Sequence, residues 1–256
     1  MGCDGCELWN KTTKLCYAGK TTEPKSGLPG WPKSFDEPMI FPDRLPPALK
    51  WKDLTGTDRL EKPWLNGLPR IIFLNDMGDT FSKKLPEDWF AEFLPAIASS
   101  AHRFLVLTKR PSLFARFAAR NPLPENVWLG TSVTSDATLK RVEQLAEIET
   151  GGPKFVSAEP LLDCPVWDRS EALKRGDVKW MIFGGVSGAD APFCDPGWIQ
   201  YGVNFCSDFG IKTFVKQLGS NCGLKLKDSH GGDWNEWPTE FRVREMPAVK
   251  YQSLLI

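Results

Sequence analysis

Three cysteines near the amino terminus form the densest group of reactive side chains in the sequence. Cys3 and Cys6 are separated by two residues, and Cys6 and Cys16 by nine. Thiolates are the usual ligands of iron–sulfur clusters, and three of them leave one iron of a four-iron, four-sulfur (4Fe-4S) cluster open to another molecule. Gly2 and Gly5 would let backbone N–H groups approach the sulfur atoms. The spacing therefore favours a cluster with one iron available for chemistry.

Two other interpretations of these cysteines stay open. A structural zinc site needs four ligands, and the only histidines, His102 and His230, lie far away in sequence. Buried thiols without any ligand are the third interpretation, which the polar residues around Asp4 disfavour. The sequence does not begin with a basic region followed by an apolar run, so we expect no signal peptide and a cytoplasmic protein with reduced thiols.

The second half of the chain holds four further cysteines and two notable tryptophans. The cysteines are Cys164, Cys194, Cys206 and Cys222. Free cysteine is among the most buried residue types, so we expect these thiols to pack in the core, and a second cluster is the alternative. Trp234 and Trp237 are expected to pack the tail onto the fold, with stacking on a nucleobase as the alternative.

Composition limits the class of protein. Of the 256 residues, 41% are hydrophobic and 25% are charged, as in an ordinary globular protein. The 32 basic residues balance 32 acidic ones, so bulk charge does not direct the chain to nucleic acid, although a local basic groove is compatible with this balance. No apolar run approaches the roughly 20 residues of a membrane span, so we expect no membrane partner.

Four regions of different composition are predicted to form one domain over residues 1–256. Residues 1–20 hold the cysteine loop, and residues 21–70 hold nine of the 21 prolines, which forbids a long helix there. Residues 71–218 are the predicted core of the fold. Residues 219–256 form a C-terminal extension without clear periodicity.

Six short apolar runs within residues 71–218 have the composition of parallel strands buried on both faces. They cover residues 71–74, 104–107, 127–129, 154–156, 180–183 and 213–215. Helix-like stretches are predicted between them, at residues 85–94, 111–119, 136–148 and 196–209. Six such units in series predict an α/β fold, a partial (β/α)6 TIM-like barrel. A doubly wound open sheet is the alternative, but no Gly-x-Gly-x-x-Gly motif follows a strand.

Polar side chains follow nearly every predicted strand, at the end where parallel α/β folds bind ligands. They are Asn75, Asp76, Asp79, Lys109, Arg110, Ser132, Thr134, Glu159, Ser187, Lys216 and Gln217. Ordinary explanations exist for some of them, because Asn and Asp cap turns and Ser and Thr cap helices. Lys109 and Arg110 oppose the helix dipole ahead of Pro111, which favours an anion-binding role. Glu159 lies in an apolar stretch and needs a partner, either a ligand or Lys109 or Lys216.

Seven segments, in their order and spacing, resemble one enzyme family. The loop that ends Cys16-Tyr17-Ala18 resembles the cluster-binding loop of radical S-adenosylmethionine enzymes. Later segments resemble a branch that contains spore photoproduct lyase-like proteins and a phage-associated family with a three-cysteine motif. These segments cover residues 71–81, 104–111, 127–133, 155–162, 181–188 and 214–219.

The resemblance implies a cluster on Cys3, Cys6 and Cys16 at the C-terminal mouth of the barrel, with S-adenosylmethionine bound to the open iron. It implies one-electron cleavage of that cofactor, with flavodoxin or ferredoxin as electron donor, and hydrogen abstraction from a substrate by the resulting 5′-deoxyadenosyl radical. The implied cofactor-binding residues are Asn75, Asp76, Asp79, Lys109, Ser132, Thr134, Glu159, Gly184 and Gly185. Arg110, Ser187, Lys216 and Gln217 are the implied substrate residues.

The implied substrate is a base in DNA, as in phage DNA modification, or a nucleotide, with chemistry of the lyase or isomerase type. A free small molecule or a peptide is the alternative substrate. The alternative functions are a zinc-binding module without radical chemistry and a barrel with a degenerate cluster site that binds a phosphorylated ligand.

Two structural requirements accompany the resemblance. The nine residues between Cys6 and Cys16 must form a short loop whose ends return to one place. The family also places a strand before the cysteine loop, whereas only Met1 and Gly2 precede Cys3. Either residues 38–41 supply that strand or the native start lies upstream.

Overall fold

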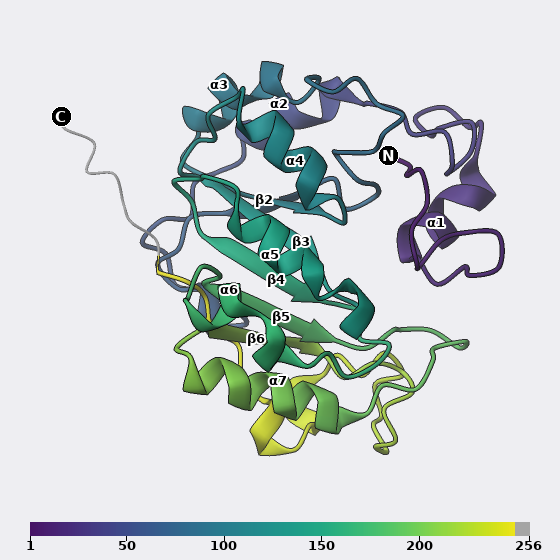
Figure 1. Ribbon diagram of the computed structural model, residues 1–256, viewed down its shortest axis with the longest axis vertical. Helices are drawn as coiled ribbons and strands as arrows, with labels where there is room; N and C mark the ends of the chain where they lie inside the picture. Colours follow the sequence, from purple (N-terminus) through teal and green to yellow (C-terminus); the bar gives the residue numbers. More distant parts are fainter. Residues whose placement is uncertain (249–256) are drawn as a thin grey trace.

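One curled sheet of six parallel strands organises the protein, which a computed structural model describes over residues 1–248 (Figure 1). The strands are β1 (Ile71–Leu74), β2 (Arg103–Thr108), β3 (Val127–Ser132), β4 (Lys154–Ala158), β5 (Trp180–Gly184) and β6 (Lys212–Gln217). Their order in the sheet follows their order in the chain, and each neighbouring pair is parallel. All six strands lie where the sequence predicts them. The unbroken order is that of a half-barrel, because a doubly wound sheet reverses its order at a switch point.

The helices that connect successive strands cover the convex face of the sheet, and two further helices precede the first strand (Figure 1). The helices are α1 (Tyr17–Thr22), α2 (Leu45–Leu49), α3 (Leu94–Ala98), α4 (Pro111–Ala118), α5 (Lys140–Ala146), α6 (Glu171–Lys174) and α7 (Pro196–Asp208). The predicted helices at residues 111–119 and 196–209 correspond to α4 and α7. The stretch at residues 136–148 begins with a 3-10 turn, Asp136–Thr138, that Ser135 and Thr138 cap, and continues as α5.

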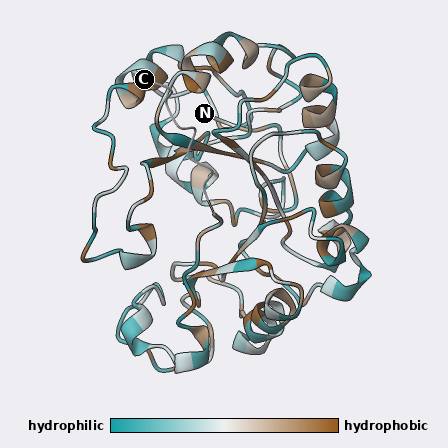
Figure 2. Ribbon diagram, turned by 90° about the vertical axis from the view of Figure 1, so that its left-hand side faces the viewer, coloured by the Kyte–Doolittle hydropathy of each residue, from teal (hydrophilic) through white to brown (hydrophobic). Residues whose placement is uncertain are grey.

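The strands bury both of their faces, which explains their continuous apolar sequences. Val106, Val156 and Met181 pack under the helices in the main core. Their chain neighbours, such as Phe155 and Trp180, instead join a second cluster on the concave face, with ring centroids 5.7 Å apart. Figure 2 shows hydrophobic colouring along these strands. The concave cluster forms an apolar floor inside the half-barrel.

Two local predictions are wrong. Residues 85–94 do not form a helix: turns lead into a 3-10 turn at Ala91–Phe93, and α3 begins only at Leu94, because Pro95 suits the first turn of a helix. Residues 38–41 do not form a strand. Met39 instead exchanges backbone hydrogen bonds with Met1.

The proline-rich segment contains no long helix, as expected, and it links the two ends of the sheet. Trp64, just ahead of β1, packs against Phe214 of β6 and against Trp234, with ring centroids 6.0 and 5.1 Å apart. Arg244 lies over the Trp64 ring at 4.7 Å. Trp237 is buried and donates to the Gly231 carbonyl oxygen at 3.1 Å, so it packs the tail onto the fold as predicted.

The rest of the C-terminal extension, residues 249–256, lies outside the described residues. Cys194, Cys206 and Cys222 are buried in the main core, as expected for packing thiols. Across residues 1–248, no helix has the length and apolarity needed to cross a bilayer.

Candidate functional site

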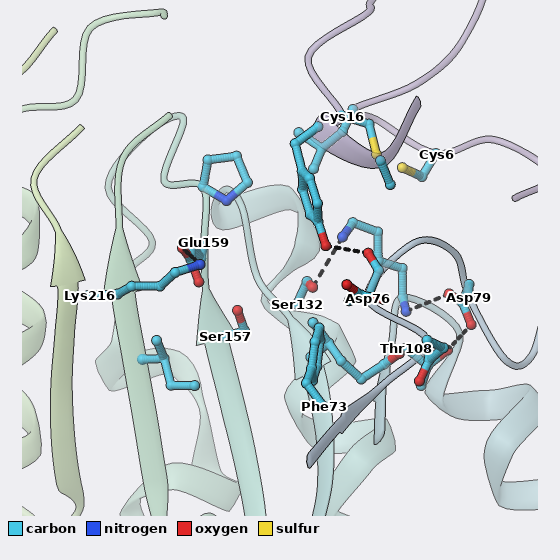
Figure 3. A pocket seen from close by; sticks show the side chains of 18 of the residues that line it. Cys6, Cys16, Phe73, Asp76, Asp79, Thr108, Ser132, Ser157, Glu159 and Lys216 are labelled. Carbon is cyan, nitrogen blue, oxygen red and sulfur yellow. Dashed lines mark hydrogen bonds and ion pairs between the residues drawn. The ribbon is translucent and has the colours of Figure 1, made fainter. Parts of the chain in front are cut away.

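The nine residues between Cys6 and Cys16 form a tight hairpin. Cys6 and Trp9 exchange backbone hydrogen bonds of 2.9 and 3.1 Å, and Trp9 pairs in antiparallel fashion with Lys14. The Cys16 backbone N–H then donates to the Leu8 carbonyl oxygen at 3.0 Å. The hairpin thereby returns Cys16 to the side of Cys6, and their side chains lie together at the top of the site (Figure 3).

Trp9 is the packing centre of this hairpin. Its ring is buried and meets Phe35 edge-on, with centroids 5.1 Å apart. Gly19 of α1 lies against the same ring, where a Cβ atom would come within 2.4 Å. The backbone N–H of Cys3 donates to the Phe35 carbonyl oxygen at 2.8 Å, so Cys3 shares this packing. The three cysteines therefore belong to one small folded unit.

All three cysteines line one cavity of about 700 Å³ at the C-terminal ends of the strands. The predicted residues that line it with them are Asn75, Asp76, Asp79, Lys109, Ser132, Glu159, Gly185, Ser187, Lys216 and Gln217. The sequence did not single out Tyr17, Phe73, Trp180 and Phe214, which also line the cavity. The cavity therefore combines thiols, a polar mouth and an apolar floor.

Three predicted residues do not belong to that lining. Gly184 lies behind it and makes room for Gln217 and Glu159, whose side chains a Cβ atom would meet at 3.3 Å. Thr134 and Arg110 instead contact the cysteine loop, as described below.

The wall formed by β4, β5 and β6 carries paired polar groups on the side of the cavity away from the cysteines (Figure 3). Lys216 Nζ lies 2.7 Å from Glu159 Oε1, so Lys216 is the partner of the half-buried Glu159 carboxylate. Gln217 Nε2 donates to Ser187 Oγ at 2.7 Å and to the Gly185 carbonyl oxygen at 2.7 Å. This wall offers charged and hydrogen-bonding groups of both signs to a ligand.

The wall nearer the cysteines comes from the ends of β1, β2 and β3. Lys109 Nζ donates to Ser132 Oγ at 3.1 Å. Tyr17, next to Cys16, reaches across the mouth and donates its hydroxyl to the Asp76 carbonyl oxygen. Burial raises the pKa of this hydroxyl. The phenol therefore stays a neutral donor that ties the cysteine unit to the end of β1.

Asn75 has two unusual features. Its backbone φ is 55°, in the left-handed region that residues other than glycine rarely adopt. Its Nδ2 donates to the Leu107 carbonyl oxygen at 3.0 Å, whereas its buried Oδ1 has no hydrogen-bond partner among the described residues. A buried acceptor without a donor is costly, so this oxygen at the cavity suits a ligand that brings an N–H or O–H group.

Asp79 is buried and fully engaged. Its carboxylate accepts from the Phe81 N–H at 3.0 Å, from Thr108 Oγ1 at 2.8 Å and from the Lys109 N–H at 3.0 Å. It also accepts from Arg110 Nη1 at 2.9 Å. Asp79 therefore organises the ends of β1 and β2, and its oxygens are already occupied by protein donors.

Two arginines clamp the cysteine loop to the sheet. Arg110 binds the Asp4 carboxylate and donates to the Gly5 carbonyl oxygen at 2.8 Å. Arg141 holds Glu7 with two hydrogen bonds of 2.8 Å, and Thr134 donates to the same carboxylate at 3.1 Å. The sequence analysis did not predict a role for Asp4, Glu7 or Arg141. The available signal was the acidic residue that directly follows each of the first two cysteines.

The clamps and burial set the charge states of the loop. Burial would raise the pKa of Glu7, but the hydrogen bonds and charge of Arg141 outweigh it and lower this pKa to about 2. Burial raises the pKa of the Cys3 thiol to about 11, against the opposing charge of Arg110, and burial also raises the pKa of Cys6. Metal binding at these thiols would therefore release protons.

A cluster and a single metal ion make different demands on the three thiols. Within residues 1–248, no three His, Cys, Asp or Glu side chains converge closely enough to hold one metal ion. In a 4Fe-4S cluster each thiolate binds a different iron, so the three sulfur atoms need to face one space and not one point. Three thiols that line a common cavity meet that condition.

Comparison with known families gives a match over most of the chain. A family described as "Protein of unknown function (DUF5131)" matches residues 2–239. The chain belongs to this family. The matched region takes in the cysteine hairpin, all six strands and the cavity, so the whole candidate site lies within the DUF5131 region. No curated protein and no solved structure matches the chain.

Proposed function

We propose that this DUF5131 protein is a radical S-adenosylmethionine enzyme with a partial (β/α)6 TIM-like barrel. The observation that carries the proposal is the hairpin, which turns Cys16 back to Cys6 beside a cavity that Cys3 also lines. When bound there, a 4Fe-4S cluster and S-adenosylmethionine would supply a hydrogen-abstracting 5′-deoxyadenosyl radical, with the electron drawn from a flavodoxin or ferredoxin.

The residues nearest the cysteines suit the two charged ends of the cofactor. Asn75 Oδ1 and the Asp76 carboxylate accept hydrogen bonds from its ammonium group, and Lys109 pairs with its carboxylate. Ser132 Oγ, already held by Lys109, serves a ribose hydroxyl. The backbone of Gly185 lines the cavity and is proposed to meet the adenine ring, while the place of a side chain is taken by the Leu218 carbonyl oxygen, 2.5 Å from where a Cβ atom would lie.

The opposite wall suits the substrate. Glu159, Lys216, Ser187 and Gln217 bind its polar groups. The apolar floor, where Trp180 and Phe214 pack with ring centroids 6.1 Å apart, excludes water from the reacting atoms. We propose a nucleobase, in DNA or in a nucleotide, as the substrate, because aromatic side chains stack on bases of any sequence.

A direct test is anaerobic reconstitution with iron and sulfide. We expect a brown protein with about four irons per chain. After addition of dithionite and S-adenosylmethionine, it is expected to release 5′-deoxyadenosine, and a nucleobase substrate should increase the amount. A colourless protein that holds one zinc per chain under these conditions would contradict the proposal.

Asn75 provides a test of the cofactor site. Asn75→Ala and Asn75→Gly both remove the unpartnered acceptor, so both should weaken binding of S-adenosylmethionine to the reconstituted protein by about 1–3 kcal/mol, as measured by calorimetry. The two variants should differ in thermal stability, since alanine at this positive φ costs about 1 kcal/mol more than glycine. Unchanged cofactor affinity in the glycine variant would remove Asn75 from the binding site.

A further inference from the structure

Arg110 touches a cysteine sulfur as well as the loop that carries it. Its Nη1 and Nη2 atoms lie 3.7 and 3.8 Å from Cys3 Sγ, within hydrogen-bonding range for sulfur. The Arg110 side chain is only 12% exposed, so its charge is poorly screened by water. A positive charge beside Cys3 is therefore held inside the protein.

Carboxylates on two sides fix the plane of this guanidinium. Asp79, at the end of β1, binds Nη1 at 2.9 Å, and Asp4, in the cysteine loop, binds Nη2. The Gly5 carbonyl oxygen accepts from Nη2 at 2.8 Å. These partners come from both the sheet and the loop. The guanidinium group therefore cannot rotate away from Cys3 without breaking several charge-assisted hydrogen bonds.

We propose that Arg110 is a positioning residue that holds the Cys3 sulfur and raises the reduction potential of the cluster bound there. This inference rests on the proposed function. The reduced cluster carries one more negative charge than the oxidised cluster, so an adjacent cation and N–H donors stabilise the reduced form more. Hydrogen bonds to ligand sulfurs and net charge near the cluster are the levers by which proteins set such potentials.

Arg141 is a matched control within the same chain. It clamps the same loop, with two hydrogen bonds to Glu7 and one of 3.0 Å to the Ser132 carbonyl oxygen, and its side chain is 14% exposed. Its hydrogen bonds go to these oxygens and not to a cysteine sulfur. Loss of Arg141 therefore loosens the loop without removing a sulfur contact.

The experiment compares Arg110→Gln and Arg110→Lys with Arg141→Gln and Arg141→Lys after anaerobic reconstitution. Each full-length protein is titrated with dithionite through soluble mediators, which add one electron per cluster, and the reduced cluster is quantified by electron paramagnetic resonance. At a fixed potential, we expect the ratio of reduced to oxidised cluster in Arg110→Gln to fall at least tenfold, a shift of about 59 mV to more negative potential. Arg110→Lys keeps the positive charge but loses the planar guanidinium group, so its reduction potential should shift less.

Comparison of the Arg110 and Arg141 variants distinguishes a direct effect on the cluster from loosening of the loop. Support comes from a shift to more negative potential in Arg110→Gln that is absent in Arg141→Gln, or from loss of cluster in a folded Arg110→Gln protein while Arg141→Gln retains its cluster. A shift of Arg110→Gln to more positive potential overturns the inference. Equal behaviour of the two glutamine variants overturns the inference, because it would mean that Arg110 acts only by clamping the loop. If the glutamine variants do not fold, the lysine pair decides in the same way. A wild-type protein that takes up no cluster contradicts the proposed function instead.

Discussion

Protein in which Cys6 is replaced by alanine is expected to hold no 4Fe-4S cluster after anaerobic reconstitution. Two thiolates remain in such a variant, and each cluster iron that binds the protein needs a ligand of its own. Iron per chain should fall from about four to near zero, and the brown absorption and 5′-deoxyadenosine release should be lost with it. Cys3→Ala and Cys16→Ala are expected to behave in the same way.

Cys164 supplies the control for this loss. It is half-buried, and it does not line the cavity. Cys164→Ala should therefore retain iron and activity. The cysteine variants should keep their circular dichroism spectra, because the hairpin packs outside the main core of the sheet. A Cys6→Ala protein with a full complement of iron would contradict the proposed ligand set.

Replacement of Asp79 by alanine is expected to lower the free energy of unfolding by about 3 kcal/mol. The change strips a buried arginine of one carboxylate partner, and removal of one member of a buried ion pair typically costs about 3–5 kcal/mol. Asp4 still pairs with Arg110 in this variant, which places the effect at the lower end. The measurement is urea denaturation of the metal-free protein.

Asp79→Asn is the matched variant for that measurement. The amide keeps the size of the side chain and one acceptor oxygen, so the loss should be smaller than in Asp79→Ala. An Asp79→Ala protein as stable as the wild type would show that the network around Thr108 and Arg110 contributes little to the fold.

The sheet could be predicted from the sequence because each strand carries its own local signal. Runs such as Phe104–Leu107 are apolar on both faces, and such runs indicate strands that are covered on both sides. The helix predicted at residues 85–94 was wrong because apolar spacing does not reveal where Pro95 allows a helix to begin. The parallel topology of the strands then places most of the predicted strand-end residues around one cavity, with Arg110, Thr134 and Gly184 as the exceptions.

The loop contacts could not be predicted, since they depend on pairs far apart in sequence. Glu7 and Arg141 are 134 residues apart, and neither has a local pattern that names the other. The hairpin between Cys6 and Cys16 likewise depends on Trp9 packing against Phe35. Thr134 lay at a predicted strand end but serves the loop, because the acidic side chain that it binds comes from outside the barrel.

The large sequence separation of the two arginine–carboxylate contacts affects when the cysteine loop can dock during synthesis. Asp4 meets Arg110 over 106 residues and Glu7 meets Arg141 over 134, so the cysteines leave the ribosome well before the residues that fix them. Such distant contacts form late, because the intervening chain must be ordered first. During synthesis the three thiols therefore belong to an undocked hairpin that solvent and oxidants can reach. We expect insertion of the proposed cluster to follow docking of the hairpin on Arg110 and Arg141, and the thiols to depend on a reducing environment until then.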